Sequence, residues 1–186
     1  MPLSAQEVHP DIERVVADEA TIRDTVRALG RRISDDYGNE PVLLVAVLRG
    51  AALFVADLAR EITSPVEVDF MAVSSYGSST KSSGVVRILK DLDEDIEGRN
   101  VLVVEDILDT GLTLKYLLKN LSTRNPASLE VVTLFSKLGK QRVDIDCRYV
   151  GIEIPDEFVV GYGLDYDEKY RNLPYVGVLK REVYEG

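Results

Sequence analysis

Several residue types that build common functional sites are scarce in this sequence. Cys147 is the only cysteine, so no disulfide can form within the chain, which agrees with a reducing cytosol. His9 is the only histidine and stands next to Pro10, so a metal or acid–base centre built on imidazole is not expected. No apolar run approaches the roughly 20 residues that span a bilayer, and the first residues lack the basic-then-apolar pattern of a signal peptide. We therefore expect a cytoplasmic protein that does not use a membrane.

Positive charge is also in the minority. The chain carries 22 lysines and arginines against 32 aspartates and glutamates, a formal net charge of −10. A broad surface for nucleic acid needs clustered lysine and arginine, so nucleic acid is not an expected partner. The hydrophobic fraction of 45% and the charged fraction of 29% are ordinary for a soluble globular protein. A chain of 186 residues holds one substantial core, and we expect residues 1–186 to form a single domain.

Patterns of apolar residues predict an α/β domain. Aliphatic runs at 42–48 and 101–104 are typical of strands buried on both faces of a parallel sheet, and 129–135 indicates another buried strand. Helical spacing predicts helices after Asp18, which is a suitable N-cap, and after Gly50 and Thr113. Further strands are expected at 12–17, at 85–90 and at 66–75, where Val66, Val68 and Phe70 alternate with Glu67 and Asp69. The predicted fold class is α/β, with a mainly parallel central sheet flanked by helices.

The turn between the 101–104 strand and the following helix has the composition of a phosphate site. Thr110, Gly111 and Thr113 stand where a helix begins. Free backbone N–H groups and two hydroxyls can converge there on a phosphate, and the glycine allows a close approach. The alternative is that the threonines are helix caps without a ligand.

Three acidic residues precede that turn. Glu105 and Asp106 can accept hydrogen bonds from a diol such as that of ribose, directly or through Mg²⁺. Asp109 is then left as a candidate proton acceptor. The alternative is that all three are solvated loop residues, because short motifs carry real false-positive risk. With the phosphate turn, these acids predict a site for a ribose that carries a 5′-phosphate.

The stretch Glu-Asp-Ile-Leu-Asp-Thr-Gly-Leu-Thr resembles the phosphoribosyl-diphosphate (PRPP) motif of type I phosphoribosyltransferases, in the form of the hypoxanthine-guanine branch. The resemblance runs from about Val42 to Leu179. It implies the type I fold, with a small hood built from the N-terminal residues and about 150–186. It also implies transfer of the phosphoribosyl group from Mg²⁺-bound PRPP to hypoxanthine and/or guanine. Related enzymes are dimers or tetramers, so a homodimer or homotetramer is expected.

The same resemblance assigns the residues that hold PRPP. Leu112 joins the 5′-phosphate turn, where other members carry lysine. Arg49 and Gly50 occupy the pyrophosphate loop, which often contains a non-proline cis peptide at the bond matching Leu48–Arg49. Arg171 is suited to clamp pyrophosphate through its two-pronged guanidinium. Glu105, Asp106 and Asp165 are the implied metal ligands.

The purine site is implied by four positions. Phe158 offers a flat face on which a base can stack, and the backbone of Val159 can bond the base edge. Lys137 follows a predicted core strand and would donate to the exocyclic oxygen of a 6-oxopurine. Asp165 is placed near the base as well as the metal. Read singly, such a lysine is more often solvated than functional, and such an aromatic residue more often belongs to a structural hairpin.

Residues 74–84 are rich in serine and glycine, which by composition alone predicts a flexible loop. Two interpretations are open, a hairpin tip and a lid that excludes water during transfer. Ser75-Tyr76 matches the Ser-Tyr pair of the family's closing loop.

Two rival functions also remain: a xanthine-preferring enzyme, and a PRPP-sensing regulator with the same fold that binds RNA.

Overall fold

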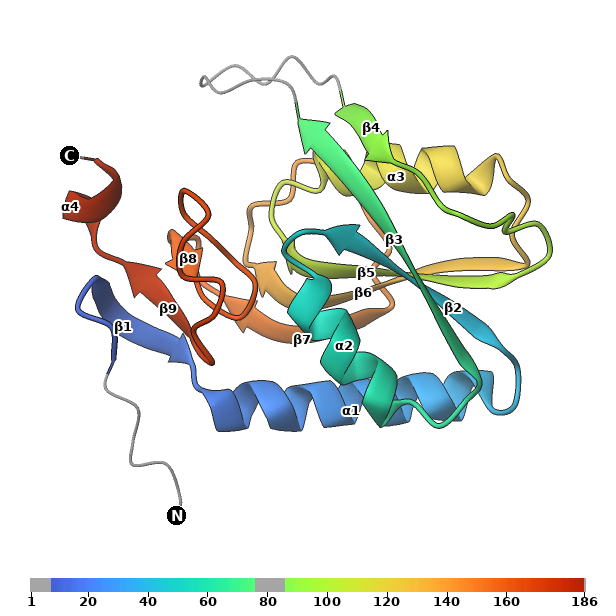
Figure 1. Cartoon of the computed structure of the whole chain (residues 1–186), viewed down its shortest axis with the longest axis horizontal. Coiled ribbons are helices and arrows are strands. Elements are labelled where there is room, and N and C mark those ends of the chain that lie inside the picture. Colours follow the sequence, from blue (N-terminus) through green and yellow to red (C-terminus); the bar gives the residue numbers. More distant parts are fainter. Residues whose placement is uncertain (1–7, 76–85, 186) are drawn as a thin grey trace.

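A six-stranded sheet forms the centre of the computed structural model, which describes residues 8–75 and 86–185 (Figure 1). The strand order is β4-β3-β2-β5-β6-β7, and only the β3–β4 pair is antiparallel. The strands are β2 (Val42–Leu48), β3 (Val66–Ser75), β4 (Val86–Lys90), β5 (Asn100–Leu108), β6 (Ser128–Lys137) and β7 (Tyr149–Ile154). The predicted mainly parallel sheet is confirmed.

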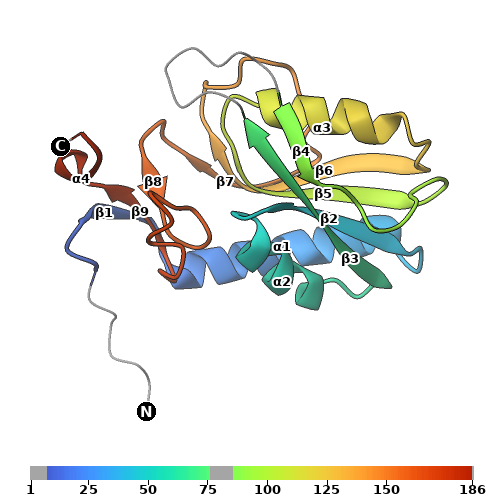
Figure 2. The same ribbon diagram turned by 45° about the horizontal axis from the view of Figure 1, so that its top comes forward.

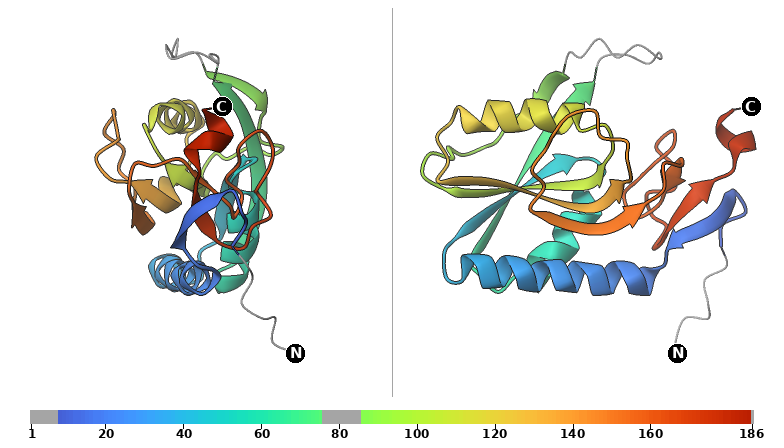
Figure 3. Two further views of the ribbon diagram at one scale, coloured as in Figure 1. Left: turned by 90° about the vertical axis from the view of Figure 1, so that its left-hand side faces the viewer. Right: turned by 180° about the vertical axis from the view of Figure 1, so that it is seen from behind.

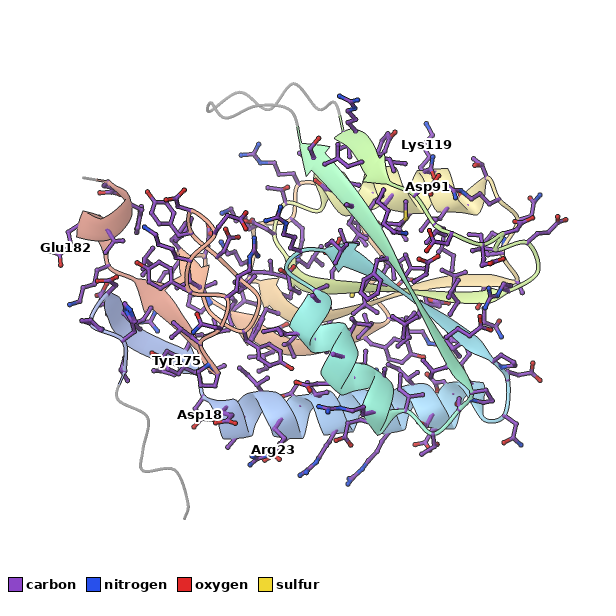
Figure 4. All side chains as sticks on the ribbon, viewed as in Figure 1. Asp18, Arg23, Asp91, Lys119, Tyr175 and Glu182 are labelled. Carbon is purple, nitrogen blue, oxygen red and sulfur yellow. The ribbon has the colours of Figure 1, made fainter. Side chains whose placement is uncertain are left out.

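Helices cover both faces of this sheet, as Figure 3 shows in two further views. α1 (Glu19–Tyr37) and α2 (Ala52–Glu61) pack on one face over Leu44 and Ala46, while α3 (Leu112–Ser122) packs on the other over Leu43 and Val45. The alternation of β2 supplies both cores because successive side chains of a strand point to opposite faces. Asp18, labelled in Figure 4, caps α1 by accepting a 2.7 Å hydrogen bond from Thr21 N.

A second, smaller sheet lies beyond one end of the main sheet (Figure 2). It contains β1 (Ile12–Ala17), β9 (Val176–Leu179) and β8 (Val159–Val160) in the order β1-β9-β8, and the short helix α4 (Arg181–Tyr184) follows β9. β1, near the start of the chain, thus pairs with β9, near its end, as expected for the hood. The predicted boundary near residue 150 is wrong, because β7 pairs in parallel with β6 and belongs to the main sheet.

The strand alternation predicted for 66–75 is wrong in one respect. Val68 is 42% exposed, whereas Asp69 is only 8% exposed. Asp69 is buried because its carboxylate accepts hydrogen bonds from Phe70 N at 2.7 Å and Asp93 N at 2.8 Å, with Lys90 Nζ at 3.4 Å.

Among residues 8–75 and 86–185, no helix is long and apolar enough to cross a membrane.

Candidate active site

The predicted site residues gather where three adjacent parallel strands end. Arg49 and Gly50 follow β2, Asp109 follows β5, and Lys137 is the last residue of β6. The order β2-β5-β6 makes these strand ends neighbours, although they are far apart in the sequence. The carboxyl ends of strands in such a sheet are where α/β proteins bind ligands. The sheet therefore assembles the site from separate loops.

The adjacent acids lie within β5 and are not solvated loop residues. Glu105 pairs with Thr133 of β6 and is 8% exposed, while Asp106 is half-buried. Burial, and then the charge of Asp106, raise the pKa of Glu105 well above its usual range. Burial likewise raises the pKa of Asp106 to about 6. These two adjacent carboxyl groups with raised pKa values form a site that a cation would stabilise in its ionised form.

Gly50 brings the β2 loop against these acids. A Cβ atom at Gly50 would lie 1.6 Å from Asp106 Oδ2. Only a residue without a side chain allows this approach, so the loop after β2 and Asp106 are in direct contact. The Leu48–Arg49 peptide bond is cis, as the resemblance implies.

The predicted phosphate turn is the start of α3. Gly111 is its N-cap, in the left-handed conformation with φ of 79°, and no side chain caps the helix. Thr110 and Thr113 are therefore not side-chain caps of α3, which removes the alternative role considered for them. A helix leaves its first N–H groups without partners inside the helix, and its dipole favours an anion there. The turn has the backbone geometry of a phosphate cradle, with Leu112 exposed at its edge.

Asp109 and Lys137 meet in an ion-pair cluster that contains two further residues. Lys137, only 7% exposed, places Nζ 3.4 Å from Asp109 Oδ2 and 3.5 Å from Asp156 Oδ1. Lys140 Nζ lies 3.3 Å from Asp109 Oδ1 and 2.7 Å from Asp156 Oδ1. A hydrogen bond to Asp156 is the main reason that the pKa of Lys140 is raised. The burial of Lys137 removes the solvated alternative.

The sequence analysis missed Lys140 and Asp156. The available signals were their positions, three residues after Lys137 and two before Phe158. Neither position identifies a partner, because the contacts join the end of β6 to the loops that follow β5, β6 and β7.

The loop that follows β8 contacts the loop that follows β2. Arg171 Nη2 lies 3.0 Å from Asp165 Oδ1, and its Nη1 donates to Gly163 O at 2.6 Å. A Cβ atom at Gly163, where φ is +97°, would lie 2.1 Å from Gly50 O, so this loop touches the β2 loop directly. Arg49 reaches the same loop through Glu168, with Nη1 to Oε2 at 2.6 Å. Glu168 is a third residue that sequence reasoning missed.

Phe158 lies just before β8 and remains 39% exposed. Its neighbour Val159 is buried and pairs with Val178 of β9. Tyr166 contacts the Phe158 ring edge-on, with centroids 5.7 Å apart. The small sheet thus holds an accessible aromatic ring, which is what a stacking platform for a base needs.

The predicted lid lies mostly outside the described residues, including Tyr76. Its first residues end β3, where the backbone of Ser75 pairs with Val86 of β4. Ser75 and Val86, the described residues on either side of 76–85, therefore lie side by side.

Comparison with known proteins agrees with this arrangement. The family model for the phosphoribosyl transferase domain matches residues 15–167. The hypoxanthine-guanine phosphoribosyltransferase of Mycobacterium avium is 54% identical over 99% of this chain and 94% of its own, and that of Bacillus subtilis is 51% identical over 94% and 97%. The crystal structure of a hypoxanthine phosphoribosyltransferase from Staphylococcus aureus superposes with a TM-score of 0.93 at 47% identity, covering 98% of this chain and 100% of that one. The chain belongs to the phosphoribosyl transferase domain family and, within it, to the hypoxanthine-guanine phosphoribosyltransferases.

Proposed function

We propose that this protein salvages purine bases by transferring the phosphoribosyl group of PRPP to hypoxanthine and/or guanine, giving IMP or GMP and pyrophosphate. The observation that carries the proposal is the meeting of Lys137 and Asp109 beside the acids of β5. A cation and a carboxylate are thereby presented together at the strand ends, next to a helix N-terminus suited to phosphate. The relatives that share about half of this sequence carry the name of the same activity.

PRPP would lie along the loops that follow β2 and β5. Thr110, Gly111, Leu112 and Thr113 bind its 5′-phosphate, mainly through backbone N–H groups and hydroxyls. Arg49, Gly50 and Arg171 hold the pyrophosphate group. A guanidinium can bind a phosphate group through two parallel hydrogen bonds, which are stronger than hydrogen bonds between neutral groups. This assignment accounts for the contact of the Gly163 loop with Gly50, because that contact brings Arg171 toward the β2 loop.

Glu105, Asp106 and Asp165 are the proposed ligands of Mg²⁺. Their chemistry fits this ion, which prefers one or two carboxylates together with substrate oxygens. The raised pKa values of Glu105 and Asp106 support the assignment, since a bound cation would offset the cost of ionising them. When bound, Mg²⁺ neutralises charge on the pyrophosphate leaving group.

The base would stack on Phe158, with Val159 and Asp165 along its edge. Lys137 donates to the exocyclic oxygen, which selects 6-oxopurines over adenine because an ammonium cannot accept from an amino group. Asp109 accepts the proton from the purine's N7 as a general base. The other imidazole nitrogen of the purine, N9, then forms its bond to the anomeric carbon while the bond from that carbon to pyrophosphate breaks.

The transition state carries developing positive charge on the ribose. The carboxylates of β5 would stabilise that charge electrostatically, so no covalent intermediate with the protein is needed. Ser75, Tyr76 and the remainder of 74–84 are proposed to close over the site and exclude water. The proposal also includes one domain over residues 1–186 and a cytoplasmic location. The protein is further proposed to form a homodimer or homotetramer, and sedimentation velocity tests this oligomeric state.

The deciding experiment offers hypoxanthine, guanine, xanthine and adenine separately to the purified protein with PRPP and Mg²⁺, and measures nucleotide formation. Turnover with hypoxanthine or guanine, and none with adenine, is expected. Preferential turnover of xanthine would revise the substrate. Binding of PRPP without turnover of any base would overturn the proposal in favour of a PRPP-binding regulator, which salt-dependent RNA binding would then test.

A further inference from the structure

The carboxyl-terminal helix contacts the proposed purine platform. The ring of Tyr184 in α4 stacks on Phe158 with centroids 4.9 Å apart and an interplanar angle of 27°. Tyr166 closes the group, edge-on to Phe158 and 6.3 Å from the Tyr184 centroid. Tyr184 thus covers one face of the Phe158 ring and Tyr166 stands perpendicular to that ring, yet the residue is still 39% exposed. The ring retains accessible surface that these two tyrosines do not cover.

The small sheet fixes this contact. Leu179 N donates to Phe158 O at 2.9 Å, so the end of β9 lies beside the start of β8. The chain then turns at once into α4, whose Val183 packs in the same apolar cluster as Ile12 and Val160. The hydrogen bond of Leu179 and the packing of Val183 together place Tyr184 against Phe158. The stack therefore follows from sheet register and core packing.

We propose that Tyr184 is a positioning residue for the base, which it serves by holding the Phe158 ring in a single stacking orientation. The inference rests on the proposed function, in which the purine stacks on Phe158. An exposed phenylalanine at a strand end is free to change rotamer, and ordering it upon binding reduces affinity. Aromatic pairs prefer the offset-stacked and edge-to-face arrangements that Tyr184 and Tyr166 make here. Prepared in this way, the ring presents its uncovered surface to the base.

Steady-state kinetics of Tyr184→Ala test the proposal. KM for hypoxanthine is expected to rise roughly three- to tenfold, the size of an aromatic pair's coupling, while kcat and KM for PRPP stay close to those of the parent protein. Tyr184→Phe should restore the parent KM, because only the ring is required. Glu182→Ala is the matched control in the same helix, since its exposed side chain points away from the rest of the molecule in Figure 4.

Other outcomes would overturn the inference. An unchanged or lowered KM for hypoxanthine would mean that Tyr184 does not support the platform. Equal rises in KM for both substrates, or a changed sedimentation coefficient with Tyr184→Ala, would point to a general structural role. Phe158→Ala, measured in parallel, separates the role of Tyr184 from the proposed stacking of the base on Phe158. A raised KM there with none for Tyr184→Ala removes only this inference, whereas no effect of either variant removes the proposed platform itself.

Discussion

Gly50→Ala tests the contact between the proposed pyrophosphate loop and Asp106, a proposed ribose and metal ligand. The new Cβ atom would lie 1.6 Å from Asp106 Oδ2 and 2.6 Å from its Cγ. Non-bonded heavy atoms pack at roughly 3.5 Å, so the carboxylate must retreat by about 2 Å. That movement endangers the 2.7 Å hydrogen bond that Asp106 Oδ1 accepts from Ile107 N. Gly50 does not have a positive φ, so the collision itself is the expected source of the cost.

The expected cost is about 1–3 kcal/mol, which is typical of a side chain forced into occupied space. For a chain of this length each kcal/mol lowers Tm by roughly 2–4 °C, which gives a decrease of about 2–12 °C. Because the displaced group is the proposed ribose and metal ligand, a similar loss is expected in PRPP binding. That corresponds to a rise in KM for PRPP of roughly 5- to 150-fold.

Differential scanning calorimetry and initial rates with PRPP varied provide the two readouts. A double-mutant cycle is the control, because Asp106→Ala removes the atoms that the new Cβ atom would meet. In that background Gly50→Ala should lower Tm by less than about 2 °C, since little remains to be displaced. The same decrease in both backgrounds would refute the collision. An unchanged KM for PRPP in the single variant would refute the link between this loop and the ribose site.

Three further outcomes are expected. Asp109→Asn should lower turnover roughly 10²-fold or more with PRPP binding largely kept, because an amide cannot accept the proton; unchanged turnover would refute the general-base role. Chelating Mg²⁺ with EDTA should abolish nucleotide formation and added Mg²⁺ restore it, since the proposed ligands need the ion to bind PRPP; turnover that persists in EDTA argues against the metal site. Asp69→Asn should flatten the acid side of the stability curve. Burial raises the pKa of Asp69, but the hydrogen bonds from Asp93 N and Phe70 N and the charge of Lys90 lower it below 3.8 overall. The ionised form therefore stabilises the fold above that pH, and the contribution is lost as the pH falls through the lowered pKa. Thermal melts between about pH 3 and 7 measure this, and parallel curves for the parent and the variant would contradict it.

Much of the secondary structure was determined by the sequence alone. The runs that form β2 and β5, the helix that Asp18 caps, and the turn at Gly111 depend on spacing between near neighbours. Such periodicities and caps are local physical signals, because they record which face of a strand or helix is buried and which backbone groups lack partners. The PRPP motif is local in the same sense, which is why it was readable as a phosphate and ribose site.

The relations between segments were decided only by the tertiary structure. The strand order places Asp109 beside Lys137, and the return of the chain after β7 adds Asp156 to them. Hydrogen bonds from outside its own strand account for the burial of Asp69, and the register of β8 against β9 accounts for the stack of Tyr184 on Phe158. These contacts depend on how distant elements pair, and pairing is set by the packing of the whole sheet and core. A local pattern can therefore predict that a carboxylate or an aromatic ring is available, while the fold decides which partner it meets.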